Sequence, residues 1–346
     1  MGGRCHLLAY VVRRLALAIL VLWGAATIAF FISHMIPSDP ARLIAGPQAT
    51  HSQIESIRRQ YGLNLPLLQQ YTFYVGGLIH GNLGYSMLTQ QPVMQNVYDY
   101  FPATVELGLS SFVIFVVLGV PLGVLAAVYR TKWVDQLVRT LGVAATSAPG
   151  FWLAIMAQLV FYGILHWLPL EGQFGVGVAP PHPLTGFYLL DDLLEGHWAA
   201  LWDAVRHLVL PSVTLGLASV GYMIRMTRSS MLEYMREDYV RTARAKGLPE
   251  TRVLLRHVLR NAITPLISIS GLQVGSVLGG VVVIESVFDW PGIGRYLLTA
   301  VLNLDFNAIV GVTVVLTLVY VVVNLVTDIA YVLTDPRASL GSNTRI

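Results

Sequence analysis

Few residues in this chain of 346 residues have the types and spacing that catalysis or metal binding requires. Ser147 and His166 could serve as a nucleophile and its base, as in an intramembrane protease, but no nucleophile motif accompanies them. Cys5 is the only cysteine, which excludes an internal disulfide and a cysteine-based metal cage. The histidines near apolar segments are not spaced as metal ligands are: His34, His80, His166 and His207. We predict no catalytic residue and no metal site.

Polar side chains within apolar segments are the next candidates, because such groups inside a membrane usually serve a function. We expect Glu106 in the first turn of a helix, where its carboxylate offsets the positive helix end. We expect Asp328 to pair with Arg337 or with a neighbouring loop arginine. The other polar groups could line a pathway or form hydrogen bonds between helices; they are Gln158, Gln273, Ser276 and Asn324.

The stretch YVRTARAKGLPETRVLLRHVLRNAITP, residues 239–265, concentrates positive charge in an otherwise apolar chain. Glycine tolerates the left-handed backbone that ends a helix, and proline suits the start of one, so Gly247-Leu248-Pro249 predicts two short helices joined by a bend. The basic residues either keep this segment on the cytosolic side or form a docking surface for a cytosolic partner. They are Arg241, Arg244, Lys246, Arg252, Arg256 and Arg260.

In the second of these helices, the apolar residues should face the lipid or the helix bundle, and the arginines should face water and headgroups. The apolar residues are Val253, Leu254, Val258 and Leu259.

The composition predicts an all-α polytopic membrane protein. Hydrophobic residues make up 55% of the chain and charged residues only 12%, against about 25% in soluble domains. Six apolar runs reach the roughly 20 residues that a spanning helix needs. They are Leu15–Ile36, Ala103–Val128, Thr140–Leu168, Leu208–Met226, Ala262–Ile284 and Ala308–Leu333.

The basic residues between these runs lie on one side, which predicts that both termini and the 239–265 stretch are cytoplasmic. Residues 1–100 would form a first helix plus an extracytoplasmic segment, and residues 101–335 a transmembrane domain with a cytoplasmic loop at 227–262. Within the extracytoplasmic segment we expect a short helix, capped by Thr50 or Ser52 with Glu55 and ended by Gly62. Helix five should pack closely through small residues, namely Gly271, Gly275, Gly279 and Gly280.

The segment ESVFDWPGIG, residues 285–294, lies between the last two expected spans. It could be a structural turn in which Phe288 and Trp290 anchor the membrane interface. It could instead be an external gate or a contact for a substrate-delivering protein, formed by Phe288, Asp289, Trp290, Pro291 and Gly292.

The stretch from Arg225 to Pro265 resembles the cytoplasmic loop of ABC importer permeases of the dipeptide, oligopeptide and nickel family. The resemblance extends over nearly the whole chain, through residues 34–40, 81–86, 103–108, 285–294 and 324–337. It implies that the loop couples to an ATPase, although Arg241 replaces the glutamate that names the family's EAA-type motif. The implied coupling residues are Arg241, Thr242, Ala243, Arg244, Ala245, Lys246 and Gly247.

The same resemblance implies a type I ABC importer transmembrane domain in a bacterial or archaeal plasma membrane, without enzymatic activity of its own. Implied partners are a second homologous permease, two cytosolic ABC ATPases, an extracytoplasmic binding protein and membrane lipid, but no nucleic acid. ATP and magnesium would bind the ATPases, since this chain has no G-x-x-x-x-G-K-[ST] loop and no cofactor. The implied substrate is a dipeptide or oligopeptide, and the alternative substrates are nickel, glutathione or a haem-like solute. An ion-coupled secondary transporter is the alternative function.

Overall fold

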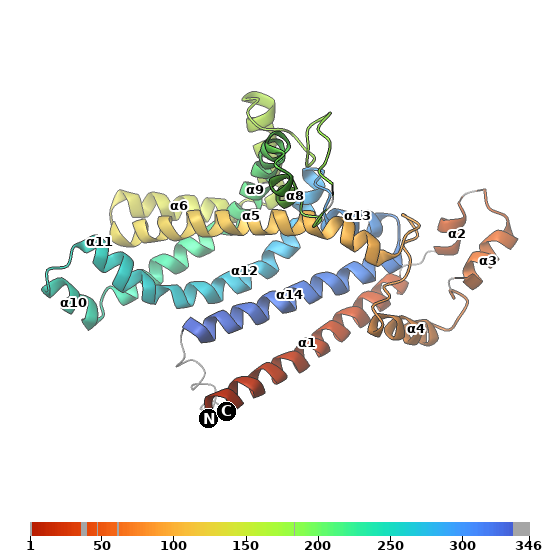
Figure 1. Ribbon diagram of the computed structural model, residues 1–346, viewed down its shortest axis with the longest axis horizontal. Coiled ribbons are helices and arrows are strands. Elements are labelled where there is room, and N and C mark those ends of the chain that lie inside the picture. The colour runs from red at the N-terminus through yellow and green to blue at the C-terminus, as the bar shows by residue number, and fades with distance from the viewer. Residues whose placement is uncertain (1, 36–39, 47, 61, 183, 335–346) are drawn as a thin grey trace. The chain divides into compact units, whose positions relative to one another are not determined.

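The computed structural model describes residues 2–35, 40–46, 48–60, 62–182 and 184–334 (Figure 1). Within these ranges the chain forms helices, and the only β pairing is an isolated bridge between Tyr85 and Pro92. The all-α prediction is therefore confirmed for the described residues. Residues 36–39, within the stretch 34–40 that carries part of the resemblance, and Arg337, an expected partner of Asp328, lie outside them.

Three of the described helices are long and apolar enough to cross a membrane. They are α5 (Val93–Val128), α9 (Trp198–Tyr234) and the part of α14 (Phe306–Thr334) that runs from Phe306 to Ala330. Two bent pairs of helices would raise the number to five. In α1 (Gly2–Met35) the described apolar part, Ala16–Ile32, is shorter than a span. The multi-pass architecture is confirmed, and the count of six spans stays a prediction.

The third expected span, Thr140–Leu168, is not one straight helix. It consists of the end of α6 (Trp133–Ser147), then α7 (Gly150–Ala157) and the π-helical η1 (Gln158–Ile164). The axes on the two sides of the break differ by 103°. Pro149 explains the break, because proline disfavours a helical backbone at the preceding residue, and Ala148 is extended with ψ 134°.

The helix α5 begins ten residues before the apolar run that opens at Ala103, because Pro92 supplies its start and Pro102 does not interrupt it. Glu106 therefore lies well inside the helix, and its expected place in the first turn is wrong. The side chain is buried, and accepts hydrogen bonds from Gln173 Nε2 at 3.1 Å and from the backbone N–H of Leu189 at 2.9 Å.

The chain divides into two compact units. The smaller comprises Met1–Pro102 and Pro291–Val321, and the larger comprises Ala103–Trp290 and Val322–Ile346. In the smaller unit, the core residues Val93, Ile293 and Val312 are fully buried. Its short helices are α2 (Pro40–Ala45), α3 (His51–Gln60), α4 (Leu67–Ile79) and α13 (Ile293–Leu302).

The helix α3 carries the expected cap with a different partner. The hydroxyl of Thr50 accepts from the backbone N–H of Gln53 at 3.4 Å, and the side chain of Gln53 accepts from the N–H of Thr50 at 2.8 Å. This is a reciprocal capping box. Glu55, the partner expected from the sequence, forms an ion pair with Arg58 instead, at 3.0 Å. Gly62 follows the helix with φ 65°, in the left-handed region as expected.

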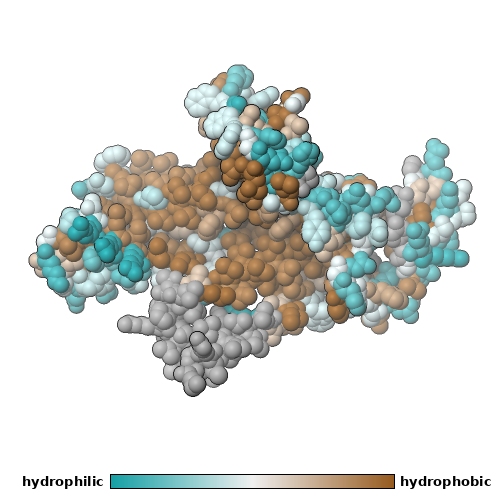
Figure 2. All heavy atoms as spheres, in the orientation of Figure 1, coloured by the Kyte–Doolittle hydropathy of each residue, from teal (hydrophilic) through white to brown (hydrophobic). Residues whose placement is uncertain are grey.

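In the larger unit, α9 packs against α6 and against α12 (Arg260–Val287). The helix α8 (Tyr188–Glu195) precedes α9, whereas α10 (Asp238–Ala245), α11 (Glu250–Arg252) and the π-helical η2 (Val253–Leu259) follow it. Hydrophilic residues gather over α10 and α11, and hydrophobic residues cover α5 and α6 (Figure 2).

Glycines allow close approaches between the helices of the larger unit. A Cβ at Gly271 would collide with Thr327 on α14, as the small-residue spacing predicted. A Cβ at Gly279 would meet none of the described residues within 4 Å, so the prediction of close packing is wrong at that position for the described part of the chain. The tightest backbone approach lies elsewhere, where a Cβ at Gly221 on α9 would overlap the carbonyl of Gly142 on α6.

Candidate functional site

The helix α10 has one buried face and one exposed basic face. Val240 and Ala243 are buried, at 0% and 6% exposure, and fix the helix to its neighbours. On the exposed face, Arg241 forms an ion pair with Asp238 at 3.3 Å. The remaining expected coupling residues of this helix and its end are also exposed: Thr242, Arg244, Ala245 and Lys246. The structure therefore places all seven implied coupling residues, 241–247, in one short element at the surface, in which only Ala243 is buried.

The turn after α10 is a Schellman motif. The N–H of Gly247 donates to the carbonyl of Arg244 at 2.9 Å, and the N–H of Leu248 donates to the carbonyl of Ala243 at 3.4 Å. Gly247 has φ 73°, a backbone conformation that favours glycine. Pro249 then precedes α11. The predicted helix–bend–helix arrangement is confirmed.

An ion pair that the sequence did not suggest spans this turn. The guanidinium of Arg244 donates from Nη2 to Glu250 Oε1 at 2.7 Å and from Nε to Glu250 Oε2 at 3.1 Å. These hydrogen bonds are the main reason why the pKa of Arg244 is raised above its ordinary value. Glu250 follows Pro249 in the first helical turn, where a carboxylate is favoured, and this position is the only signal the sequence offers.

The second helix behaves as predicted. Val253, Leu254 and Val258 are buried, whereas Arg252, Arg256 and Arg260 are exposed. The buried residues form one cluster with Val240 and Ala243 of α10, Met231 of α9 and Ala127 of α5. A displacement of α10 would therefore be transmitted to α9 and α12 by close-packed side chains.

Residues 285–294, the external segment, are more deeply buried than their sequence suggested. Phe288 and Trp290 are each 1% exposed, and the indole N–H of Trp290 donates to the carbonyl of Ala103 at 2.9 Å. Their expected role as interfacial anchors is wrong, because both rings complete the core of the larger unit. Asp289 between them is exposed, with φ 49°. In the smaller unit, Pro291 is half-buried and Gly292 is the extended residue before α13.

The expected pathway residues are not brought together by any contact that the structure describes. The side-chain amide of Gln158 donates to the backbone carbonyls of Leu170 at 3.0 Å and Val287 at 3.1 Å, so it bonds between segments of the larger unit. Gln273 is buried in α12. The side chain of Ser276 lies outside the described part of the structure. A role of these residues in a pathway remains a prediction.

Residues 119–340 match the family described as binding-protein-dependent transport system inner membrane component, and residues 7–108 match the N-terminal part of such membrane components. A solved structure titled inward facing conformations of the MetNI methionine ABC transporter has 18% identity and a TM-score of 0.47, and covers 68% of this chain and 93% of that one.

Curated relatives align along almost the entire chain. A probable D,D-dipeptide transport system permease protein, DdpB, of Escherichia coli K12 is 45% identical over 93% of this chain and 95% of its own. The di/tripeptide transport system permease protein DppB of Pseudomonas aeruginosa is 42% identical over 96% and 98%. The glutathione transport system permease protein GsiC of Escherichia coli is 38% identical over 95% and 98%. The chain therefore belongs to the family of binding-protein-dependent transport system inner membrane components.

Proposed function

We propose that this chain is the permease subunit of an ABC importer that translocates dipeptides or oligopeptides across the inner membrane. The relatives named for dipeptide and di/tripeptide transport support the substrate class. An extracytoplasmic binding protein would deliver the peptide, and a second, similar permease would complete the transmembrane pathway. The ATP and magnesium would be held by two cytosolic ATPases, so this chain itself is not an enzyme.

The observation that carries the proposal is the construction of α10. Its exposed face offers Arg241, Arg244 and Lys246 to a cytosolic partner, while Val240 and Ala243 connect its opposite face to the helix bundle. A helix that is exposed on one side and close-packed on the other can convert movement of a bound partner into movement of the bundle. In our proposal α10 enters a groove of the ATPase subunit and moves with it when ATP binds.

The remaining expected residues enter the proposal with different support. Asp289 is the exposed residue of the external segment that a binding protein could contact, since Phe288, Trp290 and Gly292 are buried. A contact at Pro291 or Gly292 stays a prediction of the sequence. Burial of the two rings suits a gate that is closed in this structure. A role of Gln158, Gln273 and Ser276 in lining the pathway stays a prediction of the sequence.

Uptake of a radiolabelled dipeptide by cells that contain the complete transporter tests this function. We expect uptake to stop when the partner ATPase loses its phosphate-binding lysine, and to continue when a protonophore removes the proton gradient but ATP is maintained. The reverse pattern would establish an ion-coupled secondary transporter. The lysine variant must still assemble with the permease, which co-purification checks.

The substrate requires a separate measurement, because the relative named for glutathione transport keeps that alternative open. Calorimetric titration of the partner binding protein with dipeptides, glutathione and a nickel chelate would rank the three. We expect the tightest binding for a dipeptide. Preference for glutathione or nickel would replace the substrate and leave the ATP-driven permease function in place.

A further inference from the structure

The first turns of α9 present an aromatic and basic stripe. Trp198, Trp202 and Arg206 are spaced four residues apart, so they lie on one face of the helix. All three are exposed, with 67% of Trp198 and 66% of Trp202 accessible. Tryptophan is enriched where a membrane meets water, because its ring is apolar and its N–H is polar. The stripe is therefore built for the headgroup region of a bilayer.

The length of α9 places the stripe at that depth. The helix has 37 residues, which at about 1.5 Å per residue make it roughly 55 Å long. The hydrocarbon core of a bilayer is only about 30 Å thick, so α9 must extend beyond it, and the stripe lies in the N-terminal turns that precede the apolar run from Leu208. Ile164 and Trp167, which flank His166 on the neighbouring segment, are also exposed, at 65% and 63%.

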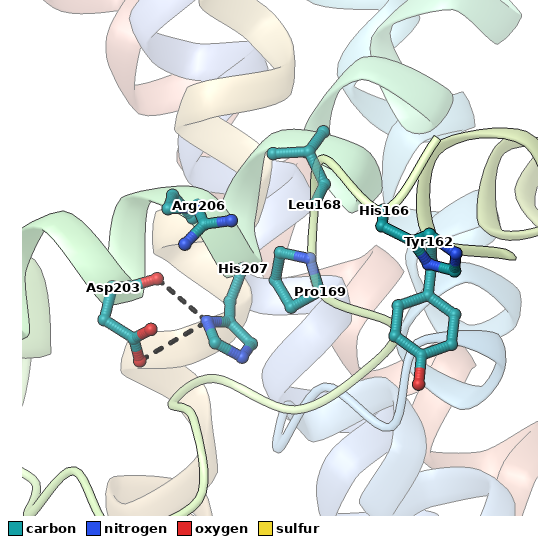
Figure 3. A pocket seen from close by; sticks show the side chains of 7 residues that line it. All are labelled: Tyr162, His166, Leu168, Pro169, Asp203, Arg206 and His207. Atoms are coloured by element: carbon teal, nitrogen blue, oxygen red, sulfur yellow. Dashed lines mark hydrogen bonds and ion pairs between the residues drawn. The ribbon is translucent and has the colours of Figure 1, made fainter. Parts of the chain in front are cut away.

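Arg206 lies at the wall of a cavity of about 160 Å³ (Figure 3). Tyr162, His166 and His207 contribute further polar groups, and Leu168 and Pro169 contribute apolar surface. The cavity belongs entirely to the larger unit. It is large enough for one phosphate group with its ester oxygens, and too small for a peptide.

The charges around the cavity leave a positive group uncompensated. Arg206 donates to the backbone carbonyl of Trp167 at 2.8 Å, and within the described chain no carboxylate lies within 4 Å of it. Asp203 is already engaged, because it accepts from the N–H of Gly175 at 2.6 Å and faces the ring of His207 at 3.5 Å. In Figure 3 Asp203 lies on the opposite side of His207 from Tyr162 and His166. Arginine with free N–H donors is the side chain best suited to phosphate oxygens.

We propose that this cavity binds the phosphate of a membrane phospholipid. The guanidinium of Arg206 pairs with the phosphate and His166 donates to one of its oxygens. Trp202, one turn farther from the membrane, contacts the headgroup, and Ile164 contacts the upper acyl chains. The surrounding apolar surface favours a lipid over a water-soluble anion, because a free phosphate gains nothing from Ile164. The site would fix the end of α9 at the membrane surface.

The full-length chain in detergent, titrated with phosphatidylglycerol and analysed by native mass spectrometry, tests the site. We expect Arg206→Gln to weaken binding of the first phospholipid roughly tenfold, the loss of one charge-assisted hydrogen-bond partner. Arg206→Lys, which keeps the charge without the fork of donors, should lose less. Arg42→Gln removes an exposed arginine from α2 and should bind lipid as the unmodified chain does. Equal affinity in Arg206→Gln and the unmodified chain would overturn the proposal.

Two further ligands identify the source of the phosphate. Diacylglycerol, which lacks phosphate, should bind equally weakly to all variants, and inorganic phosphate should bind weakly to the unmodified chain. Inorganic phosphate that binds as tightly as phosphatidylglycerol would make this a free-anion site and overturn the lipid assignment. The lipid assignment would also be overturned by an Arg206→Gln variant that keeps its lipid affinity but no longer binds the partner permease or the binding protein. If Arg206→Gln does not fold, His166→Gln and Trp202→Ala apply the same test, each with an expected severalfold loss.

Discussion

At the scale of single residues, the turn at Gly247 depends on a backbone conformation that other residues adopt only at a cost. A Cβ there would meet none of the described residues within 4 Å, so the cost is conformational, about 1–2 kcal/mol for the left-handed region. Because such an energy changes an equilibrium roughly 5- to 30-fold, we expect Gly247→Val to reduce dipeptide uptake by about tenfold. The amount of permease in the membrane should not change.

Gly177→Val is the matched control for this variant. Gly177 also has a positive φ, 90°, and open space around it, but lies outside the 239–265 stretch. Its uptake should stay near that of the unmodified chain. If both variants transported normally, a strained turn at Gly247 would have no part in coupling.

Substitutions of Arg244 and Glu250 can distinguish two roles of Arg244: stabilising the turn through its ion pair with Glu250, and contacting a partner protein. An exposed ion pair contributes only about 0.2–1 kcal/mol, so Glu250→Gln alone should leave co-purification of the ATPase nearly unchanged. Arg244→Glu reverses a charge on the exposed face of α10 and should reduce co-purification severalfold. Equal losses in the two single variants, with no further loss in the double variant, would instead assign Arg244 to bracing.

The residue types predicted some of these roles and not others. Gly247 was identifiable because a glycine two residues before a proline is typical of the end of one helix and the start of the next. Phe288 and Trp290 were misread because an aromatic residue next to a span suits either the membrane interface or the protein core. The burial of both rings, and the hydrogen bond from Trp290 to Ala103, 187 residues away, distinguish the two.

At the scale of elements, α8 contains a carboxylate that burial leaves without a hydrogen bond. Asp192 is fully buried, and within the described chain neither of its carboxylate oxygens has a hydrogen-bond partner. Burial raises the pKa of Asp192; the carboxylates of Glu195 and Asp191 act in the same direction, and His197 opposes them. The folded protein therefore binds this proton more tightly than the unfolded chain does.

The sign of the pH dependence follows from this. An aspartate in an unfolded chain has a pKa of about 3.9, so its stabilising contribution is complete below that pH and is lost as the pH rises through the higher folded value. At pH 7 we expect Asp192→Asn to stabilise the protein by about 1–3 kcal/mol, because the amide lacks the negative charge whose burial costs more than that of a neutral polar group. Thermal unfolding in detergent should show a higher Tm at pH 7 and a smaller difference toward pH 4.

The neighbouring residue provides an internal control for α8. Asp191 is equally buried, but it accepts from the N–H and hydroxyl of Thr185, at 2.9 and 2.6 Å, and from the N–H of Gly186 at 3.1 Å. Asp191→Asn should therefore lower the Tm at pH 7. A lower Tm for both variants would mean that Asp192 has a partner after all.

The boundaries of elements were harder to predict than their existence. Hydropathy located the apolar part of α5, but Val93–Pro102 continues the helix with a mixed sequence that hydropathy does not separate from a loop. Pro102 lies inside α5, whereas Pro149 separates α6 from α7. The same residue type therefore has two outcomes, and tertiary packing decides between them.

At the scale of the whole molecule, composition and charge placement predicted a multi-pass helical protein, and the resemblance of its motifs predicted the family. The division into two units was not predictable, because α13 and the start of α14 join the N-terminal residues, about 200 positions earlier in the chain. Contacts at that separation leave no periodicity in the sequence. The contact between α6 and α9 is a case within the larger unit, since Gly142 and Gly221 are 79 positions apart.

That contact provides the last prediction. Gly221→Ala places a methyl group against the carbonyl of Gly142 and against Thr146, so α6 and α9 must separate. Overpacking of this kind costs about 1–3 kcal/mol, and we expect a lower Tm in detergent. Gly279→Ala adds the same methyl group to α12 at a position where nothing in the described part of the chain lies within 4 Å, and should leave the Tm unchanged or raise it, because alanine favours a helix more than glycine does. Equal Tm values for the two variants would mean that α9 can move away from α6 at no cost.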